Sequence, residues 1–92
     1  MNESVQQDPR TGSFEILVDG ETAGRMEVVT DDGRATIPHV WVEPRFEGRG
    51  IGTRLVVAGA ERLHADGLAI RPVCSFAARV LRARPDLTEV SR

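Results

Sequence analysis

The stretch that decides the fold is VEPRFEGRGIGT, residues 42–53. It follows an apolar run, carries glycines at positions 48, 50 and 52, and leads into an amphipathic segment. The first N–H groups of a helix have no partner inside the helix and carry partial positive charge. Glycines let that backbone approach an anion because no Cβ stands in the way. A strand, a glycine-rich loop and a helix in this order predict a cradle for a phosphate group.

Two familiar phosphate-binding motifs do not fit this loop. The P-loop ends in Gly-Lys-Ser/Thr, and the chain contains no lysine. The dinucleotide fingerprint Gly-x-Gly-x-x-Gly fails because Gly48-x-Gly50 is followed by Thr53. What remains is Arg45-x-x-Gly48-x-Gly50, with Gly52 added. The alternative is a flexible turn between strand and helix, because nine glycines in 92 residues produce short glycine patterns by chance.

The segment after the loop, residues 51–66, predicts an amphipathic helix. Apolar residues fill one arc of a wheel drawn at about 100° per residue, and charged residues fill the opposite arc. The apolar arc holds Ile51, Leu55, Val56, Gly59, Ala60 and Leu63, and the polar arc holds Arg54, Glu61 and His64. Gly67 suits the end of this helix. Residues 68–73 then predict a strand that lies parallel to the preceding one through a right-handed crossover.

A final helix is predicted over residues 75–84. Ser75 is placed to cap its start and Pro85 to stop it. Its core-facing residues are expected to be Phe76, Val80 and Ala83, with Arg79 and Arg82 outward.

The residues before the loop predict an antiparallel meander. Residues 1–12 are polar and predict a loose leader. In residues 13–18, alternating apolar side chains predict a half-buried strand whose inner face holds Phe14, Ile16 and Val18. Asp19-Gly20 predicts a hairpin turn into a second strand over residues 22–29.

A turn at residues 31–33 precedes a third strand over residues 35–42. Pro38 lies inside this strand, and proline cannot donate to a ladder, so we expect an edge or a bulge that re-aims residues 39–42. The element order is therefore β-β-β-α-β-α. The fold class is α/β, or more narrowly α+β: a mostly antiparallel sheet with one parallel pair.

Composition limits the functions to consider. Ninety-two residues with 40% hydrophobic and 28% charged content predict one globular domain. The formal net charge of −2 argues against a nucleic-acid binder. The single cysteine excludes an internal disulfide, argues against a cysteine-based metal site and favours a reducing compartment. With no signal-like start and no apolar run that could span a membrane, we expect a cytoplasmic protein without a bound metal.

The loop resembles the pyrophosphate-binding loop of the GNAT superfamily of acetyltransferases, written Gln/Arg-x-x-Gly-x-Gly/Ala. More narrowly, residues 13–90 resemble a very short GNAT-like family with a third-strand histidine, a Cys-Pro-Phe segment and a His-Pro-Glu/Asp ending. The matching residues here are His39, Cys74-Ser75-Phe76 and Arg84-Pro85-Asp86. Ser75 stands where the family has proline, and Arg84 stands where it has histidine.

This resemblance implies an N-acetyltransferase domain over residues 13–92 with acetyl-coenzyme A as its cofactor. The third and fourth strands would splay to form the cofactor cleft, and the pantetheine arm would pair near residues 40–42. The implied cofactor-binding residues are Val40, Trp41, Val42, Arg45, Glu47, Gly48, Arg49, Gly50, Ile51, Gly52 and Thr53. The expected acceptor is an amine on a small molecule or a protein, with no nucleic-acid or membrane partner. We expect a monomer or a weak homodimer.

Two residues are candidates for the chemistry, and each has a simpler interpretation. Cys74 precedes a helix whose free amides favour negative charge at its sulfur, yet a free cysteine is usually a small buried apolar residue. His39 is a candidate general base, or else a structural histidine. Acetyl transfer releases coenzyme A as a thiolate, which a tyrosine commonly protonates, but the chain has no tyrosine. Either Cys74 or water would then protonate the thiolate, or Cys74 would first take the acetyl group covalently. Trp41 is expected in the core or lining the substrate cleft.

Three functions stay open from the sequence. The first is an N-acetyltransferase, and the second is a non-catalytic module that binds acyl-coenzyme A. The third is an interaction domain in which the loop is vestigial.

Overall fold

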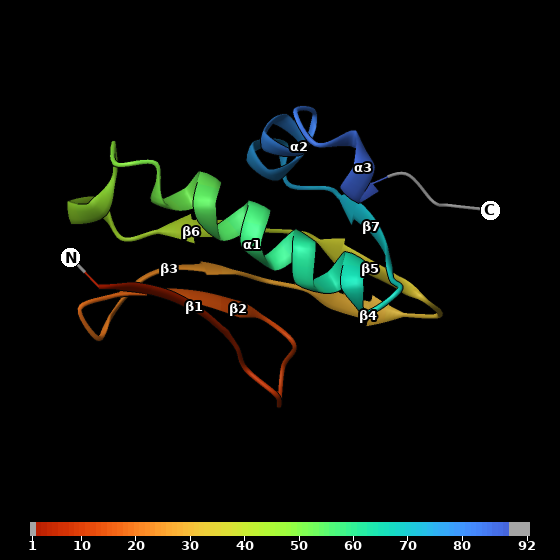
Figure 1. Ribbon diagram of the computed structural model, residues 1–92, viewed down its shortest axis with the longest axis horizontal. Coiled ribbons are helices and arrows are strands. Elements are labelled where there is room, and N and C mark those ends of the chain that lie inside the picture. The colour runs from red at the N-terminus through yellow and green to blue at the C-terminus, as the bar shows by residue number, and fades with distance from the viewer. Residues whose placement is uncertain (1, 89–92) are drawn as a thin grey trace.

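The strands form two sheets in the computed structural model, which describes residues 2–88 (Figure 1). The antiparallel sheet has the order β1 (Glu3–Gln7), β2 (Phe14–Val18), β3 (Glu21–Met26) and β6 (Val40–Val42). The second sheet has the order β4 (Val29–Asp31), β5 (Arg34–Ile37) and β7 (Ala69–Pro72). Strands β5 and β7 run parallel. The predicted α+β class, with its antiparallel strands and one parallel pair, is confirmed.

The predicted third strand is two strands, because the chain changes sheets at Pro38. Ile37 ends β5, and its carbonyl accepts hydrogen bonds from the N–H groups of Val73 (3.1 Å) and Cys74 (2.9 Å) beyond β7. After Pro38, the carbonyl of His39 accepts from the N–H of Glu27 (2.9 Å). Strand β6 then pairs with β3 alone, so the break goes further than the bulge that Pro38 predicted. The predicted second strand likewise divides into β3 and β4.

The prediction of a loose leader over residues 1–12 was wrong for its first half. Residues 3–7 form β1, which pairs antiparallel with the whole of β2. A turn follows, in which the N–H of Asp8 donates to the carbonyl of Ser13 and the N–H of Gly12 donates to the carbonyl of Asp8, both at 2.8 Å. The half-buried Val5 is the one apolar residue of this edge strand. A single apolar residue gives no alternating pattern from which a strand could be predicted.

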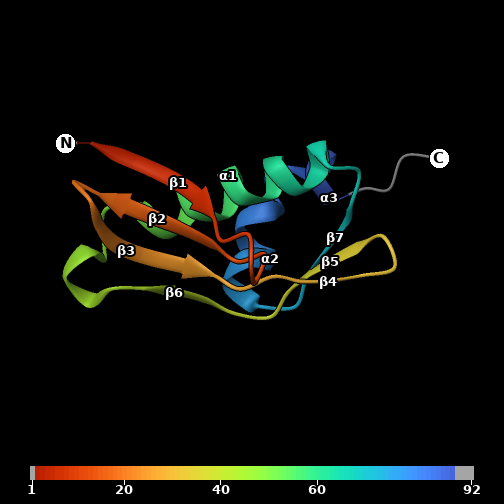
Figure 2. The ribbon, with the colours of Figure 1, turned by 90° about the horizontal axis from the view of Figure 1, so that it is seen from below.

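Helix α1 (Ile51–Ala65) is confirmed together with its orientation. It lies across the antiparallel sheet in both views (Figures 1 and 2). Every residue of the predicted apolar arc is buried, and every residue of the polar arc is exposed. Gly59 is required for close approach, because a Cβ there would collide with the methyl group of Met26 and press on the Phe14 ring.

The last helical segment differs from the prediction in length and rotation. Helix α2 (Ser75–Leu81) is followed by a separate α3 (Pro85–Thr88). Cys74, not Ser75, is the N-cap residue, without a side-chain capping bond. Ala77 and Leu81 are the buried pair, whereas the predicted Ala83 is exposed.

Pro85 does not stop a helix here but opens α3. This is a position where its missing N–H costs nothing.

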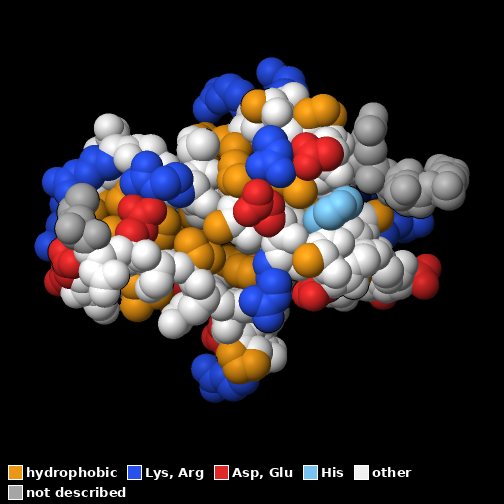
Figure 3. Space-filling model, viewed as in Figure 1, with side chains coloured by type: hydrophobic (Ala, Val, Ile, Leu, Met, Phe, Trp, Pro, Cys, Tyr) orange, Lys and Arg blue, Asp and Glu red, His pale blue; other side chains and the backbone are white. Residues whose placement is uncertain are grey.

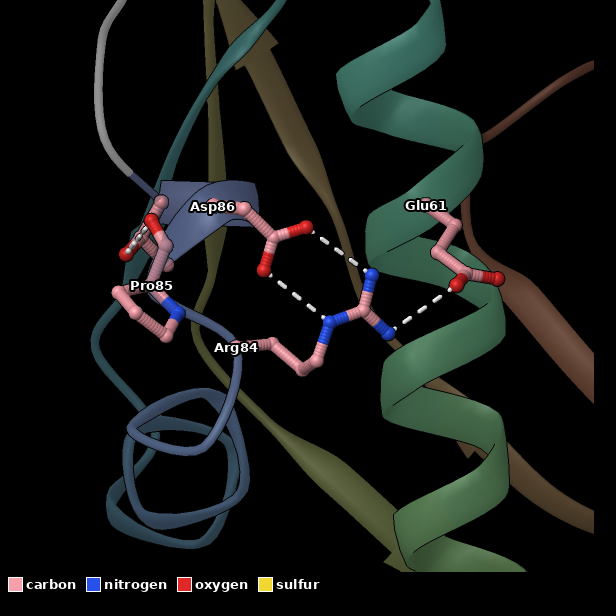
Figure 4. Close-up of polar contacts among 5 residues, drawn as sticks. Glu61, Arg84, Pro85 and Asp86 are labelled. Carbon is pink, nitrogen blue, oxygen red and sulfur yellow. Dashed lines mark hydrogen bonds and ion pairs between the residues drawn. The ribbon is translucent and has the colours of Figure 1, made fainter.

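Arg84 joins α3 to α1 (Figure 4). Its Nε and Nη2 donate to the two carboxylate oxygens of Asp86 at 3.1 and 3.0 Å, and its Nη1 donates to Oε2 of Glu61 at 3.2 Å. The hydrogen bonds to Asp86 and Glu61 raise the pKa of Arg84 above its usual value, and the bonds from Arg84 hold the pKa of Asp86 below its ordinary value. The arginine that departs from the family's histidine therefore has a structural role.

Truncating the buried face of α1 should destabilise the domain strongly. Leu55 is fully buried, and Leu63 is 1% exposed. Leu55→Ala or Leu63→Ala should lower the free energy of unfolding by about 2–5 kcal/mol through lost contacts and a residual cavity. His64→Ala, at an exposed site of the same helix, is the control and should cost less than about 0.5 kcal/mol. Urea denaturation measures all three, and comparable losses at positions 55 and 64 would contradict the packing described.

Replacing Asp86 with Asn should lower the melting temperature in a pH-dependent way. Because the pKa of Asp86 is depressed in the folded state, its contribution is present above its unfolded pKa and is lost as pH falls through the folded pKa. The difference in Tm between parent and Asp86→Asn should therefore hold at neutral pH, begin to shrink near the ordinary carboxyl value of 3.8, and vanish only below the lowered pKa of folded Asp86. Circular dichroism melts across this range test it, with the exposed Glu27→Gln as control. A difference independent of pH would show that Asp86 acts otherwise.

Candidate functional site

A cavity of about 390 Å³ opens where β6, the loop and the first turn of α1 meet α2. The 3₁₀ turn η1 (Pro44–Phe46) carries the chain from β6 into the loop. The cavity is lined by Val40, Val42, Phe46, Glu47, Gly48, Gly50, Ile51, Gly52, Thr53 and Phe76. Its volume is within the range of small-molecule sites.

Six consecutive backbone amides, those of residues 48–53, have no backbone acceptor among the described residues. The neighbouring bonds mark the limits of this run: the N–H of Glu47 donates to the carbonyl of Pro44 (3.2 Å), and the N–H of Arg54 donates to that of Gly50 (3.1 Å). Gly50 is the N-cap residue of α1, and no side chain caps the helix. Gly48 and Gly50 have φ values of 81° and 74°, a left-handed conformation that side chains disfavour. A run of unbonded amides at the start of a helix can bind an anion.

Gly52 lets three elements close around the cavity. A Cβ at this position would lie 3.0 Å from Cζ of Phe76 and 3.1 Å from Cγ2 of Val42. Since the ring and the valine come from α2 and β6, any side chain at position 52 would push them apart. The third glycine of the loop therefore serves packing.

Two ion pairs tie the cradle to the antiparallel sheet. Nη2 of Arg45 lies 2.7 Å from Oε1 of Glu21 on β3. Arg54, in the first turn of α1, donates from Nε and Nη2 to both carboxylate oxygens of Glu3 on β1, at 2.7 and 2.9 Å. The hydrogen bonds from Arg54 lower the pKa of Glu3. Nη1 of Arg54 also lies 2.9 Å from where a Cβ of Gly50 would stand, so its guanidinium group packs against the cradle.

The structure brings most of the predicted cofactor residues to the cavity. Those that line it are Val40, Val42, Glu47, Gly48, Gly50, Ile51, Gly52 and Thr53. Trp41, Arg45 and Arg49 do not line it. Alternation along β6 turns Val40 and Val42 inward, so Trp41 faces outward opposite Arg25 and is 43% exposed, not in the core as expected.

Sequence reasoning missed two aromatic residues of the lining, Phe46 and Phe76. Phe46 is buried in the structure. An aromatic residue inside an otherwise polar loop is the sequence feature that could have identified it. The sequence predicts Phe76 in the core, but α2 is rotated by one position from that prediction, so Ala77 is buried and the half-buried Phe76 lines the cavity.

Neither candidate for the chemistry lines the cavity, but both adjoin Ile37. Cys74 is half-buried and donates its backbone N–H to the Ile37 carbonyl. His39 is exposed two residues beyond Ile37. Ile37 is buried whereas His39 is exposed, because the break at Pro38 interrupts the alternation between them. Their catalytic roles stay predictions.

Residues 2–88 contain no group of three His, Cys, Asp or Glu side chains that could hold a metal ion. Within the same residues, no helix is both long enough and apolar enough to cross a bilayer.

Comparison with solved structures finds the same fold. The ribosomal-protein-S18-alanine N-acetyltransferase of Escherichia coli superposes with a TM-score of 0.68 at 20% identity, over 84% of this chain and 53% of that one. A GCN5-like protein of Staphylococcus aureus gives 0.67 at 24% identity, over 95% and 85%. A Bacillus anthracis protein assigned as a streptothricin acetyltransferase, solved with acetyl coenzyme A, gives 0.58 at 16% identity, over 78% and 44%. The chain thus spans about half the length of the Escherichia coli and Bacillus anthracis proteins.

Sequence comparison identifies the family. No curated protein sequence matches the chain. The profile of the GCN5-related N-acetyl-transferase family matches residues 13–90. The structural neighbours share too little sequence identity to show more than a common fold. The profile match covers most of the chain and therefore shows the family. The predicted family resemblance is confirmed, and the chain belongs to the GCN5-related N-acetyl-transferase family.

Proposed function

We propose that the protein is a small N-acetyltransferase that binds acetyl-coenzyme A through its Arg45-x-x-Gly48-x-Gly50 loop and transfers the acetyl group to an amine. The observation that carries this proposal is the run of free amides at residues 48–53 on the wall of the cavity. A pyrophosphate offers acceptor oxygens to several such donors at once, and the positive end of α1 adds favourable charge. These donors need no lysine and no metal.

The rest of the cofactor would follow β6 away from the cradle. Strand β6 is the last strand of its sheet and pairs on one side only, so backbone groups on its other edge are free for a pantetheine arm. Val40 and Val42 supply an apolar wall along that path. Glu47 is the acidic residue of the lining, and its carboxylate opposes an anion. Backbone donors and nearby arginines must offset that repulsion.

In the reaction, an amine nitrogen attacks the thioester carbonyl, the carbon–sulfur bond breaks, and the coenzyme A thiolate leaves. His39 would take the proton from the amine, and Cys74 would protonate the thiolate or carry the acetyl group transiently. Both lie where β5 gives way to β6 and where β7 ends, and the thioester would lie near them in this arrangement. A free cysteine suits a reducing compartment such as the cytoplasm.

The acceptor is proposed only as an amine. Structures of this fold include proteins named for acetylating ribosomal protein S18 and aminoglycosides, so the fold admits macromolecular and small acceptors.

A non-catalytic acyl-coenzyme A-binding module is the second candidate. It is favoured by one observation: the cavity is formed without Cys74 or His39. Single-turnover transfer to a panel of amines, followed by mass spectrometry, separates the two functions.

Carboxylates placed in the cradle should abolish tight cofactor binding. Gly48→Asp and Gly50→Asp should each weaken acetyl-coenzyme A binding at least about tenfold, because the new side chain stands where the pyrophosphate would. Gly33→Asp is the matched control: its φ is 77°, a Cβ there meets nothing within 4 Å, and it lies in a distant hairpin. Isothermal titration calorimetry measures all three. Affinity equal to the parent's in both cradle variants would refute the cradle.

Cys74 should react with a thiol reagent faster than a free thiol at neutral pH, and saturating acetyl-coenzyme A should protect it. Cys74→Ala should leave cofactor affinity within about twofold while reducing transfer, and His39→Ala should shift the pH profile of transfer upward, where the amine deprotonates unaided. Alkylation followed by mass spectrometry, with and without cofactor, measures the first effect. A thiol that is inert in both conditions would leave Cys74 as a packing residue and favour the binding module.

A further inference from the structure

Two aromatic walls of the cavity each hold a guanidinium over the ring. Phe46 lines the cavity from η1, and Phe76 lines it from α2. The guanidinium carbon of Arg49 lies 5.7 Å from the centroid of the Phe46 ring, and that of Arg79 lies 5.7 Å from the centroid of the Phe76 ring. A ring face attracts a cation without neutralising it. Positive charge is thereby held on two sides of one cavity by residues distant in the sequence.

Neither of these two charges is paired with a carboxylate of the described residues. Arg45 also stands over Phe46, at 4.9 Å, but it is paired with Glu21. Within residues 2–88, neither Arg49 nor Arg79 has a carboxylate oxygen within the 4.0 Å of an ion pair. Basic side chains gather over the loop end and over α2 in the space-filling view (Figure 3). Unpaired guanidinium groups keep their donors for a ligand.

We propose that Arg49 and Arg79 form a second anion subsite on the rim of the cavity, and that it takes the 3′-phosphate of the coenzyme A ribose. This inference rests on the proposed function, in which the amides of residues 48–53 hold the pyrophosphate. Coenzyme A carries one further phosphate, a monoester with a charge of about −1.5 to −2 at neutral pH. With the amides occupied, the two guanidinium groups outside the ion pairs are the charged donors left beside the cavity, and a guanidinium can bind two phosphate oxygens at once.

The subsite also explains how an acidic loop holds an anionic ligand. Glu47 lines the same cavity, and its carboxylate repels the cofactor. Arg45 and Arg54, already paired with Glu21 and Glu3, contribute little net charge. Arg49 and Arg79 are then the side chains that make the local field positive for an approaching phosphate.

The experiment compares coenzyme A with 3′-dephospho-coenzyme A by isothermal titration calorimetry at one ionic strength. The parent should bind coenzyme A at least about tenfold more tightly, since only this ligand carries the monoester. Arg49→Gln and Arg79→Gln should each reduce that ratio below about threefold and change dephospho-coenzyme A affinity by less than about twofold. Arg82→Gln, an exposed residue at the end of the same helix as Arg79, is the matched control and should keep the parent ratio.

Three other outcomes would contradict the inference. Equal affinity of the parent for the two ligands would rule out the subsite but leave the proposed function standing. Failure of the parent to bind either ligand contradicts both. Equal weakening of the binding of both ligands in the Arg49 and Arg79 variants would mean that the arginines act on the pyrophosphate.

Circular dichroism melts check that the variants fold. Arg49→Lys and Arg79→Lys keep the charge but lose the forked donor group of arginine. They replace any Gln variant that unfolds, and they should give an intermediate affinity ratio.

Discussion

The break at Pro38 is the constraint on which the rest of the structure depends. Proline has no N–H to donate, so the ladder cannot continue through it. The carbonyl of Ile37, the last residue of β5, accepts hydrogen bonds from two N–H groups of the chain after β7. Beyond Pro38 the backbone pairs with β3 and forms β6. Strands that would otherwise be neighbours therefore diverge. The free edge of β6 and the cavity under the first turn of α1 both result from that divergence.

Backbone dipoles, more than side chains, make the cradle positive. The protein as a whole carries a formal charge of −2, and Arg45 and Arg54, which flank the loop, are paired with glutamates. Exposed pairs of this kind contribute little to stability, so their main effect is on position. Arg45 anchors the loop to β3, and Arg54 anchors the start of α1 to β1. A cradle held in its binding geometry before the ligand arrives loses less conformational freedom when the ligand binds.

The two departures from the short family's pattern have different consequences. Arg84, in place of histidine, holds α3 against α1 through Asp86 and Glu61, which is a structural task. Ser75, in place of proline, is an exposed first residue of α2 whose hydroxyl makes no capping bond. Neither residue lines the cavity, so the cradle does not depend on them. Cys74 lies beside Ser75, and its reactivity decides between enzyme and binding module.

Local chemistry in the sequence determined α1, the hairpin at Asp19-Gly20, the parallel return of β7 and the place of the glycine loop. Each of these is written within a few neighbouring residues: a 3.6-residue period, a turn dipeptide, a strand after a helix, or alternating glycines. Tertiary structure alone decided that residues 3–7 form a strand, that Trp41 faces solvent and that Phe76 lines the cavity. These outcomes depend on pairing and packing between segments far apart in the chain. Val5 is the one apolar residue of β1 and cannot reveal a strand by alternation, but β2 offers it a complete set of backbone partners. The rotation of α2 was likewise set by the surfaces it meets on α1 and β7, which no window of its own sequence contains.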